Sequence, residues 1–155
     1  MIKIYTDGSC LGNPGKGGWA AILQFFVSGI KRAEKTVKGC SKKTTNNIME
    51  LTAVIEALKT LKDNAKQHKM IIFTDSQYVQ KGVTQWRDSW EYRNFRGVKN
   101  AELWKELFEL IDKYNKTDNL EIKYVKAHTN DSSNTLDEKT NNNVDKIARN
   151  STENC

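Results

Sequence analysis

Two aspartates follow segments that are predicted to form strands. Asp7 comes after the alternating run 2–6, and Asp75 comes after the apolar run 70–74. Strand ends are common sites of chemistry in α/β proteins, because the sheet positions them and solvent reaches them. If the two strands are parallel neighbours, their carboxyl ends bring the two carboxylates close together. Taken alone, Asp7-Gly8 is also typical of a plain turn.

Two further acids are expected near helix starts. Glu50 falls in the first turn of a helix that follows the capping residues 44–47, and Asp145 falls in the first turns of a terminal helix, 142–149. Helix N-termini favour carboxylates, so each acid also has a structural explanation. Four carboxylates in one cleft would repel each other and take up protons unless a cation neutralised them. All-oxygen ligation suits Mg²⁺ or Mn²⁺, and two such ions about 3.5–4 Å apart activate a water for phosphodiester hydrolysis.

Hydrophobic periodicity predicts the elements that must position these acids. The pattern indicates three antiparallel strands (2–6, 19–27 and 30–39), the first two separated by a glycine-rich loop through Gly17. Next come a helix from Ile48 to about Asn64, a buried strand 70–74, one or two short helices (78–90), a basic aromatic loop (91–100), a helix through 103–111, and a strand 120–125. Strand–helix–strand units of this length imply parallel pairing with right-handed crossovers. The expected class is therefore α/β, a mixed five-stranded sheet flanked by helices.

The composition fits one folded domain with an affinity for polyanions. The chain has 155 residues, and 37% hydrophobic content with clear periodicity argues against a disordered chain. The net charge is +6, and residues 31–43 hold six basic side chains against one acid, Glu34. Such a basic face is usually only a solvated surface, but it also suits a phosphate backbone.

Cysteine usage and hydropathy predict a cytoplasmic protein. Cys10, Cys40 and Cys155 are odd in number and far apart, which is typical of free thiols in a reducing compartment. The N-terminus resembles a strand rather than a signal peptide, and the longest apolar run, 19–27, is interrupted by Gln24 and too short to cross a bilayer. We therefore expect no membrane partner.

Three sequence blocks together carry a resemblance to a known family. They are Asp7-Gly8-Ser9-Cys10-Leu11-Gly12-Asn13-Pro14-Gly15, Thr45-Asn46-Asn47-Ile48-Met49-Glu50-Leu51 and Thr74-Asp75-Ser76-Gln77-Tyr78-Val79. With Trp86, Leu103-Trp104 and Val125-Lys126-Ala127-His128, they resemble type 1 ribonuclease H from about residue 2 to residue 148. The resemblance implies the ribonuclease H-like fold, one catalytic domain over 1–150 with a short tail at 151–155, and a monomer.

The resemblance also implies an activity and its machinery. The expected reaction is metal-dependent hydrolysis of the RNA strand of an RNA–DNA hybrid, leaving 5′-phosphate and 3′-hydroxyl ends. The metal-binding and catalytic acids map to Asp7, Glu50, Asp75 and Asp145, with Mg²⁺ or Mn²⁺ as cofactor and two ions when substrate is bound. His128 maps to a group that shuttles protons or helps release product. Asp137 and Glu138 are alternatives for the fourth acid, and the spacing Asn141-x-x-x-Asp145-x-x-Ala148 favours Asp145.

Substrate contacts map to polar, basic and aromatic positions. Minor-groove contacts, which distinguish RNA by its 2′-hydroxyls, map to Cys10, Asn13, Asn46 and Gln77. A pocket for a DNA-strand phosphate maps to Asn13, Lys43 and Thr45. A basic protrusion that clasps the hybrid maps to Trp86, Trp90, Arg93, Arg96 and Lys99, although core packing explains the two tryptophans equally well.

Two other functions remain open on the same scaffold. A non-catalytic nucleic-acid-binding domain would share the fold, since fold does not determine function, but the presence of all four acids argues against it. Another nuclease of the ribonuclease H-like superfamily, such as an integrase-like domain or a junction resolvase, would also carry clustered acids. The Thr45-to-Glu50 block and the tryptophan-bearing segment favour hybrid cleavage.

Overall fold

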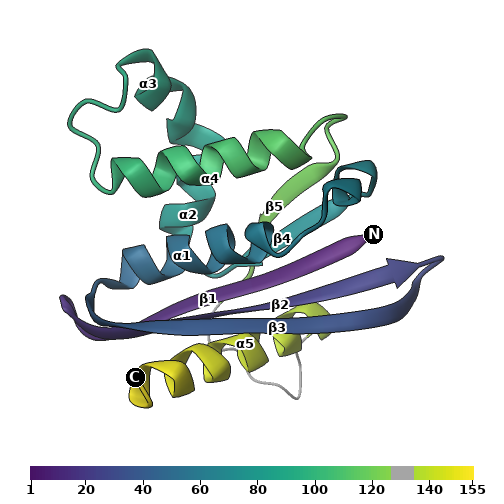
Figure 1. Cartoon of the computed structure of the whole chain (residues 1–155), viewed down its shortest axis with the longest axis horizontal. Helices are drawn as coiled ribbons and strands as arrows, with labels where there is room; N and C mark the ends of the chain where they lie inside the picture. Colours follow the sequence, from purple (N-terminus) through teal and green to yellow (C-terminus); the bar gives the residue numbers. More distant parts are fainter. Residues whose placement is uncertain (127–134) are drawn as a thin grey trace.

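The structure, a computed structural model, describes residues 1–126 and 135–155. A five-stranded sheet in the order β3-β2-β1-β4-β5 forms its centre (Figure 1). Its strands are β1 (Ile2–Gly12), β2 (Gly15–Val27), β3 (Ile30–Thr44), β4 (Met70–Thr74) and β5 (Leu120–Tyr124). β1, β2 and β3 pair antiparallel, whereas β4 pairs parallel with both β1 and β5. The predicted fold class is confirmed.

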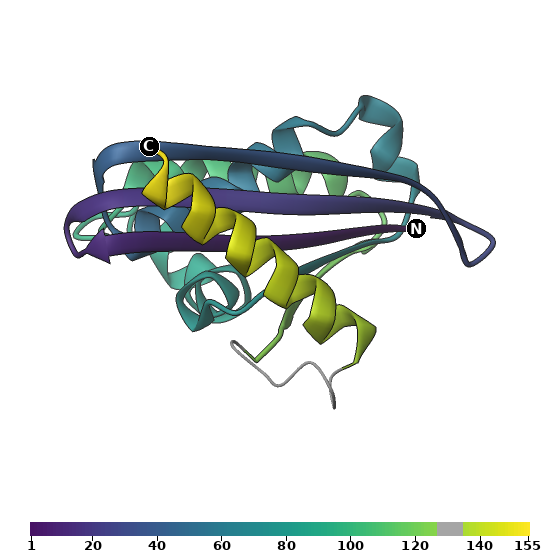
Figure 2. The same ribbon diagram turned by 90° about the horizontal axis from the view of Figure 1, so that it is seen from below.

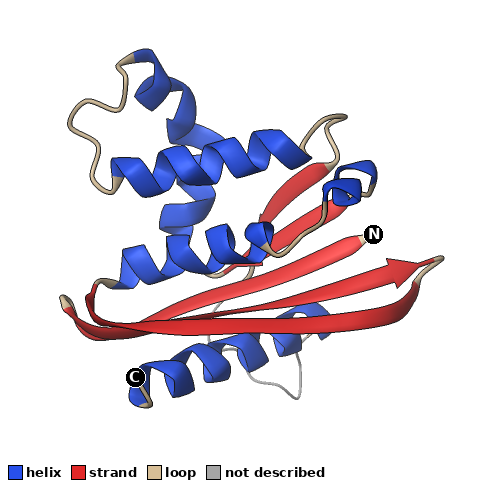
Figure 3. Ribbon diagram, viewed as in Figure 1, coloured by secondary structure: helices blue, strands red, loops and turns tan. Residues whose placement is uncertain are grey.

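Helices cover both faces of this sheet, but unequally. The helices α1 (Asn46–Lys59), α2 (Gln77–Lys81) and α4 (Ala101–Tyr114) lie on one face, and α5 (Leu136–Glu153) crosses the other (Figures 2 and 3). A 3₁₀ turn, η1 (Asp63–Gln67), follows α1, and α2 continues through a π-helical turn, η2 (Gly82–Trp86), into α3 (Arg87–Tyr92). None of the helices within the described ranges combines the length and apolar character needed to cross a bilayer.

The alternation of β1 divides the core into two clusters. Ile2 and Ile4 point into the larger cluster, which α1 and α4 close from one side. Tyr5 points to the opposite face, where its ring stacks on Phe73 with centroids 4.6 Å apart beneath α5. Neighbouring residues on a strand face opposite sides of the sheet, so β1 contributes to both clusters. The residues that follow on β1, Thr6 and Asp7, are therefore anchored by packing on both faces.

The helix α1 begins and ends earlier than its apolar periodicity suggested. Thr45 caps it, because its side-chain oxygen accepts the N–H of Ile48 at 3.2 Å. The predicted end near Asn64 is wrong, since α1 stops at Lys59 and the next residues turn into η1. Glu50 is the fifth residue of α1 and therefore lies in its second turn, not its first.

The glycine-rich stretch is mostly strand rather than loop. β1 and β2 continue to Gly12 and from Gly15, so only Asn13-Pro14, joined by a cis peptide bond, makes the turn. A Cβ atom on Gly18 would lie 2.5 Å from the backbone nitrogen of Thr152 in α5. Glycine is present there because a helix backbone lies against the strand, a role that sequence alone does not distinguish from a turn.

The terminal helix is more than twice as long as predicted. It begins at Leu136 with a capping box, in which Thr135 and Glu138 each accept the other's backbone N–H, and it continues to Glu153. Residues 151–153, expected in a tail, belong to this helix. The segment is rich in asparagine, a poor helix former, but its stripe of Val144, Ala148 and Thr152 is buried. Packing on the sheet thus overrides local propensity.

The expectation of three free thiols is wrong for two of them. Cys40 on β3 and Cys155 form a disulfide, with Cα atoms 5.7 Å apart and a sequence separation of 115. The crossing of α5 over the sheet brings its C-terminal end to β3 (Figure 2). Cysteine spacing therefore carried no information about this pair, and only Cys10 is free.

Candidate functional site

Asp7 and Asp75 meet at the carboxyl edge of the parallel part of the sheet. The last residue pair between β1 and β4 is Thr6 with Thr74. Asp7 is therefore the first residue after the part of β1 that pairs with β4, although β1 itself continues to Gly12. Asp75 is the first residue after β4. Asp7 is buried, with 3% exposure, and Asp75 is half-buried. The predicted approach of the two carboxylates is confirmed by this geometry.

Glu50 reaches the same place from α1, across a contact that needs a glycine. The backbone N–H of Gly8 donates to a carboxylate oxygen of Glu50 and, at 2.9 Å, to Oδ1 of Asp7. A Cβ atom on Gly8 would lie 2.5 Å from the backbone nitrogen of Glu50. Gly8 thus allows β1 to lie against α1 and orients two of the acids with one N–H group.

The three carboxylates form a cluster suited to a divalent cation. One ligand atom from each of Asp7, Glu50 and Asp75 lies within 4.8 Å of the other two. Burial is the largest cause that raises the pKa of Asp7, followed by the charges of Glu50 and Asp75. Burial and the charge of Asp75 also raise the pKa of Glu50.

An unpaired oxygen supports the same interpretation. Oδ2 of Asp7 is buried and has no hydrogen-bond partner, although an orphaned buried acceptor is costly. A cation bound among the three acids would satisfy this oxygen and reverse the electrostatic penalty. Mg²⁺ and Mn²⁺ prefer such carboxylate oxygens, so the residues present fit either ion.

Asp145 lies beside the cluster and not within it. It lines the same cleft, of about 360 Å³, together with Asp7, Glu50 and Asp75. The side chain of Asp145 also contributes to the raised pKa of Asp7, so the two carboxyl groups influence each other. Its Oδ2 also lies 3.0 Å from Nη2 of Arg149, one turn later on α5. Because α5 begins at Leu136, Asp145 occupies the middle of the helix, contrary to the expected position in its first turns.

The two alternative acids of α5 are engaged elsewhere. Asp137 accepts a hydrogen bond from the Tyr5 hydroxyl at 2.6 Å and forms an ion pair with Lys3 at 3.3 Å. Burial and this carboxylate raise the pKa of Tyr5. Glu138 completes the capping box with Thr135. Both acids therefore serve the start of α5, and Asp145 is the acid of this helix that lines the cleft. His128 lies outside the described residues.

The positions mapped to substrate contact gather around the start of α1. Oδ1 of Asn13, at the β1–β2 turn, accepts the backbone N–H of Asn46 at 3.1 Å, which ties the turn to the helix. Thr45 is the cap of α1, and Lys43 is exposed just before it. The Cys10 thiol donates to the carbonyl of Thr44 at 3.5 Å. Neutral polar groups, among them Asn46 and the exposed Gln77, line the cleft beside the acids.

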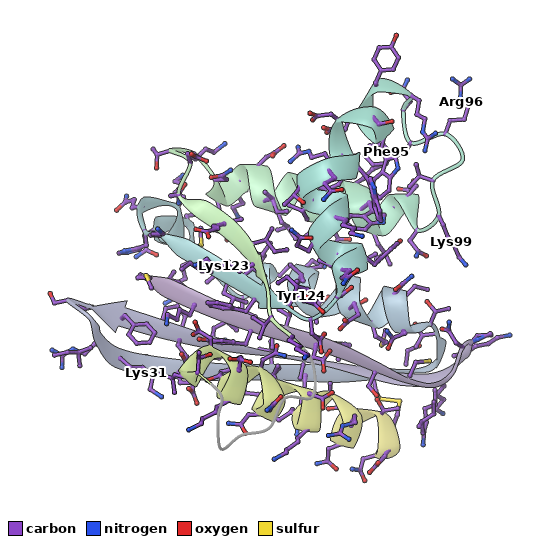
Figure 4. The ribbon with its side chains drawn as sticks, turned by 180° about the vertical axis from the view of Figure 1, so that it is seen from behind. Lys31, Phe95, Arg96, Lys99, Lys123 and Tyr124 are labelled. Carbon is purple, nitrogen blue, oxygen red and sulfur yellow. A yellow bond between two sulfur atoms is a disulfide. The ribbon has the colours of Figure 1, made fainter. Side chains whose placement is uncertain are left out.

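The two mapped tryptophans belong to an aromatic cluster. The rings of Trp86 and Trp90 lie 5.6 Å apart, and Trp90 lies 5.0 Å from the buried Trp104. Both are half-buried. Arg93 is exposed, and Arg96 and Lys99 project from the loop after α3 (Figure 4). The structure therefore places the cations of this segment at the surface and its tryptophans beneath them.

The basic run 31–43 does not form one face. It lies along β3, an edge strand, and its six cations are exposed. Lys38 pairs with Ala20 and Lys35 with Leu23, which belong to opposite sides of the sheet. Lys31, at the β2–β3 hairpin (Figure 4), forms an ion pair with Glu34 at 3.2 Å. Strand alternation thus divides the charge between two faces.

Sequence reasoning missed two groups at the site. Gly8 was identified as part of a turn, whereas its N–H orients two acids. Arg149 was not singled out, although Asp145-x-x-x-Arg149 has the i, i+4 spacing that places an acid and a base on one helix face. That spacing predicts an ion pair, but such pairs are common on exposed helices. It indicates a functional contact only when Asp145 is known to line the cleft.

Comparisons with known proteins agree in both sequence and shape. A family model described as RNase H matches residues 1–153. A ribonuclease H of Rickettsia canadensis (strain McKiel) is 43% identical over 138 residues, covering 86% of this chain and 81% of that protein. A ribonuclease H of Wolbachia sp. subsp. Drosophila simulans (strain wRi) is 42% identical over 153 residues, covering 96% and 92%.

Solved structures share the fold. The crystal structure of LC9-RNase H1, a type 1 RNase H with the type 2 active-site motif, matches with a TM-score of 0.76 at 25% identity, covering 99% of this chain and 72% of that one. LC11-RNase H1, crystallised in complex with an RNA/DNA hybrid, matches with a TM-score of 0.66 at 20% identity over 99% of this chain and 98% of that one.

Proposed function

The chain belongs to the ribonuclease H family, and on that premise we propose that it hydrolyses the RNA strand of RNA–DNA hybrids, leaving 5′-phosphate and 3′-hydroxyl ends. The observation that carries the proposal is the cluster of Asp7, Glu50 and Asp75, whose ligand atoms lie within 4.8 Å of one another. A binding domain that performs no chemistry has no need for buried carboxylates whose charges oppose one another.

We assign the metal-holding role to four acids. Asp7, Glu50 and Asp75 would hold the cation directly, with Asp145 completing the set from α5. Bound Mg²⁺ or Mn²⁺, as two ions when substrate is present, supplies an activated water and stabilises the leaving oxygen of the phosphodiester. The N–H of Gly8 keeps Glu50 and Asp7 oriented, so that their oxygens converge on one point. His128 is proposed to move a proton at the leaving group or to assist product release.

Recognition of the hybrid is proposed to begin at the junction of the β1–β2 turn and α1. Asn46, Gln77 and the backbone at Cys10 offer neutral donors and acceptors beside the acids, which suits 2′-hydroxyl groups. Asn13, Lys43 and Thr45 would hold a phosphate of the DNA strand. The hydrogen bond between Asn13 and Asn46 supports this assignment, because it fixes the turn against the helix start.

A second contact is proposed at the segment after α3. Arg93, Arg96 and Lys99 would neutralise backbone phosphates, and the half-buried Trp86 and Trp90 would lie against the same duplex. The aromatic cluster beneath supports this role, since it fixes the segment against α4.

We further propose a monomer with one catalytic domain over residues 1–150 that acts in the cytoplasm, where DNA and its RNA hybrids are found in a bacterial-type cell. The disulfide removes cysteine usage as an argument for a reducing compartment. Sedimentation of the purified chain tests the oligomeric state, because a monomer has the 17.7 kDa mass of the sequence.

The test compares three duplexes with and without metal. End-labelled RNA–DNA, RNA–RNA and DNA–DNA are incubated with wild type, Asp75→Asn or Asp118→Asn, in Mg²⁺, Mn²⁺ or chelator. Asp118 is the matched control for charge, because it is an exposed acid that precedes the start of β5, at the end of the strand away from the acidic cleft. Its φ is positive, a backbone conformation that asparagine also adopts. Metal-dependent cutting of only the RNA strand of the hybrid, lost in Asp75→Asn alone, is expected. Hybrid binding without cutting would instead favour the non-catalytic alternative.

A further inference from the structure

Asp145 differs from the other three acids in its surroundings. Asp7, Glu50 and Asp75 face one another, whereas Asp145 lies outside their 4.8 Å group and lines the same cleft from α5, which crosses the opposite face of the sheet (Figure 2). Its carboxylate is nearly buried, with 12% of the side chain exposed. The fourth acid therefore contributes to the cleft from a separate element, with contacts of its own.

Among the ion pairs of the described residues, Asp145 is paired with Arg149. Nη2 lies 3.0 Å from Oδ2 of Asp145, and 53% of the Arg149 side chain is exposed. On an ordinary helix surface such an i, i+4 pair contributes little to stability and serves only the helix. Here the acid is buried beside three other carboxylates, so the guanidinium also offsets part of their mutual repulsion.

A guanidinium and a divalent cation compete for the same oxygen. When Oδ2 of Asp145 turns toward a metal among the acids, it must weaken or share its bond to Arg149. The positive charge of Arg149 also opposes a second positive charge nearby, since unit charges attract or repel strongly in a partly desolvated site. Both effects act in the same direction and weaken cation binding at the Asp145 side of the cluster.

We propose that Arg149 is a positioning residue that weakens the binding of a divalent cation between Asp7 and Asp145. The inference rests on the proposed metal site and adds its regulation. Asp7, Glu50 and Asp75 form the tight position, and the position shared with Asp145 stays weak until something displaces the guanidinium. A phosphate group of the substrate is of the right chemistry to do so, because arginine binds phosphate as readily as carboxylate.

The test is calorimetric titration of MnCl₂ into the substrate-free protein. Arg149→Met removes the charge from an exposed position and keeps an unbranched side chain. Lys146→Met is the matched control, because Lys146 is an exposed cation on the same helix with no ion pair to the acids among the described residues. Thermal melting of each variant verifies that it is folded.

Arg149→Met is expected to tighten the weaker Mn²⁺ binding event by about threefold to tenfold, and Lys146→Met by less than about twofold. Arg149→Lys, which keeps the charge but loses the planar fork, is expected to fall between them. In an Asp145→Asn background, Arg149→Met is expected to have a smaller effect, because the carboxylate for which the guanidinium and the cation compete is gone and only the charge repulsion remains.

Three outcomes would overturn the inference. They are unchanged or weaker Mn²⁺ binding by Arg149→Met, an equal gain from Lys146→Met, and a full effect of Arg149→Met in the Asp145→Asn background. Wild-type protein that binds no Mn²⁺ and cuts no hybrid would overturn the proposed function as well. Wild type that binds and cuts, with Arg149 variants indistinguishable from it, would refute the role of Arg149 alone.

Discussion

The two faces of the sheet are covered unequally, and each face supplies part of the acidic cleft. Among the described residues, nineteen buried apolar side chains form the cluster on the face of α1 and α4, but only eight form the cluster beneath α5. Glu50 comes from the first face and Asp145 from the second. Glu50 is held by a large core and a backbone N–H, whereas Asp145 lies on a single helix that packs on the smaller cluster.

This difference separates two kinds of ligand. A side chain in the larger core keeps its position with or without a cation, because many packed neighbours would have to move with it. A side chain on α5 is held by fewer contacts and by a solvent-exposed arginine, so its position responds to what binds nearby. Acids that look alike in sequence thus differ in how firmly the fold holds them.

The largest effect is expected from the acids themselves. Asp75→Asn should lower the turnover of hybrid by about 10³-fold, the loss typical of a principal electrostatic group. Asp145→Asn should lower it by only about 10–100-fold, the range found for groups that act from outside the immediate ligand set. Single-turnover cleavage of a labelled hybrid measures both. Equal losses would contradict the division into a firm and an adjustable side.

The second largest effect is expected on stability, from loss of the disulfide. Cys155→Ser opens a loop of 115 residues, and the chain-entropy model gives a loss of about 4 kcal/mol in the free energy of unfolding. Cys10→Ser, which changes the free thiol, is the control and should cost under about 1 kcal/mol. Urea unfolding measures both variants. A Cys155→Ser protein as stable as wild type would mean that α5 holds its place without the covalent link.

Neutralising Asp7 should stabilise the metal-free protein. Its pKa is raised in the folded state, so the unfolded chain ionises first as pH rises and folding loses stability above the unfolded pKa near 4. Asp7→Asn should therefore gain about 1–3 kcal/mol at pH 7 in chelator, with the gain vanishing below about pH 4. Asp145→Asn should show no such gain, because it leaves Arg149 without its carboxylate.

These two stability curves are recorded by thermal melting between pH 3 and pH 8, and saturating Mg²⁺ should reverse the order of wild type and Asp7→Asn. A gain in Asp7→Asn that does not depend on pH would show that steric relief, and not charge, is its cause.

The smallest expected effect is the loss of one tyrosine hydroxyl on either face of the sheet. Tyr5→Phe removes the hydrogen bond to Asp137 at the start of α5 and should cost about 1.5–2 kcal/mol, because the acceptor is a carboxylate. Tyr114→Phe removes a bond to the carbonyl of Leu61 on the other face and should cost about 1 kcal/mol. Denaturant unfolding decides the order. The reverse order would show that the Tyr5 bond does not anchor α5.

The sequence predicted most of the fold because its strongest signals are local. The alternation in 2–6, the apolar run 70–74 and the stripe of Leu51, Ile55 and Leu58 each identify an element without reference to the rest of the chain. The approach of Asp7 to Asp75 followed from parallel pairing alone. These predictions required only the periods of strand and helix.

The remaining features depend on distant parts of the chain. The start of α5 at Leu136 and the role of Gly18 are consequences of packing a helix on β2, which no local pattern records. The Cys40–Cys155 pair and the burial of Trp104 among other aromatic rings also arise from contacts between segments far apart in sequence. The role of Gly8 depends on its distance from α1, which is a property of the folded chain.

The bond between Cys40 and Cys155 also changes what one peptide cut does to the molecule. Residues 40–155 form a closed covalent ring that contains α1, β4, the exposed loop around Arg96 and the whole of α5. A single proteolytic nick anywhere inside this ring leaves all residues joined in one molecule. Two of the cleft's acids, Asp75 and Asp145, would remain tethered to each other after such a cut at Arg96, and a reducing agent would be needed to release the two pieces.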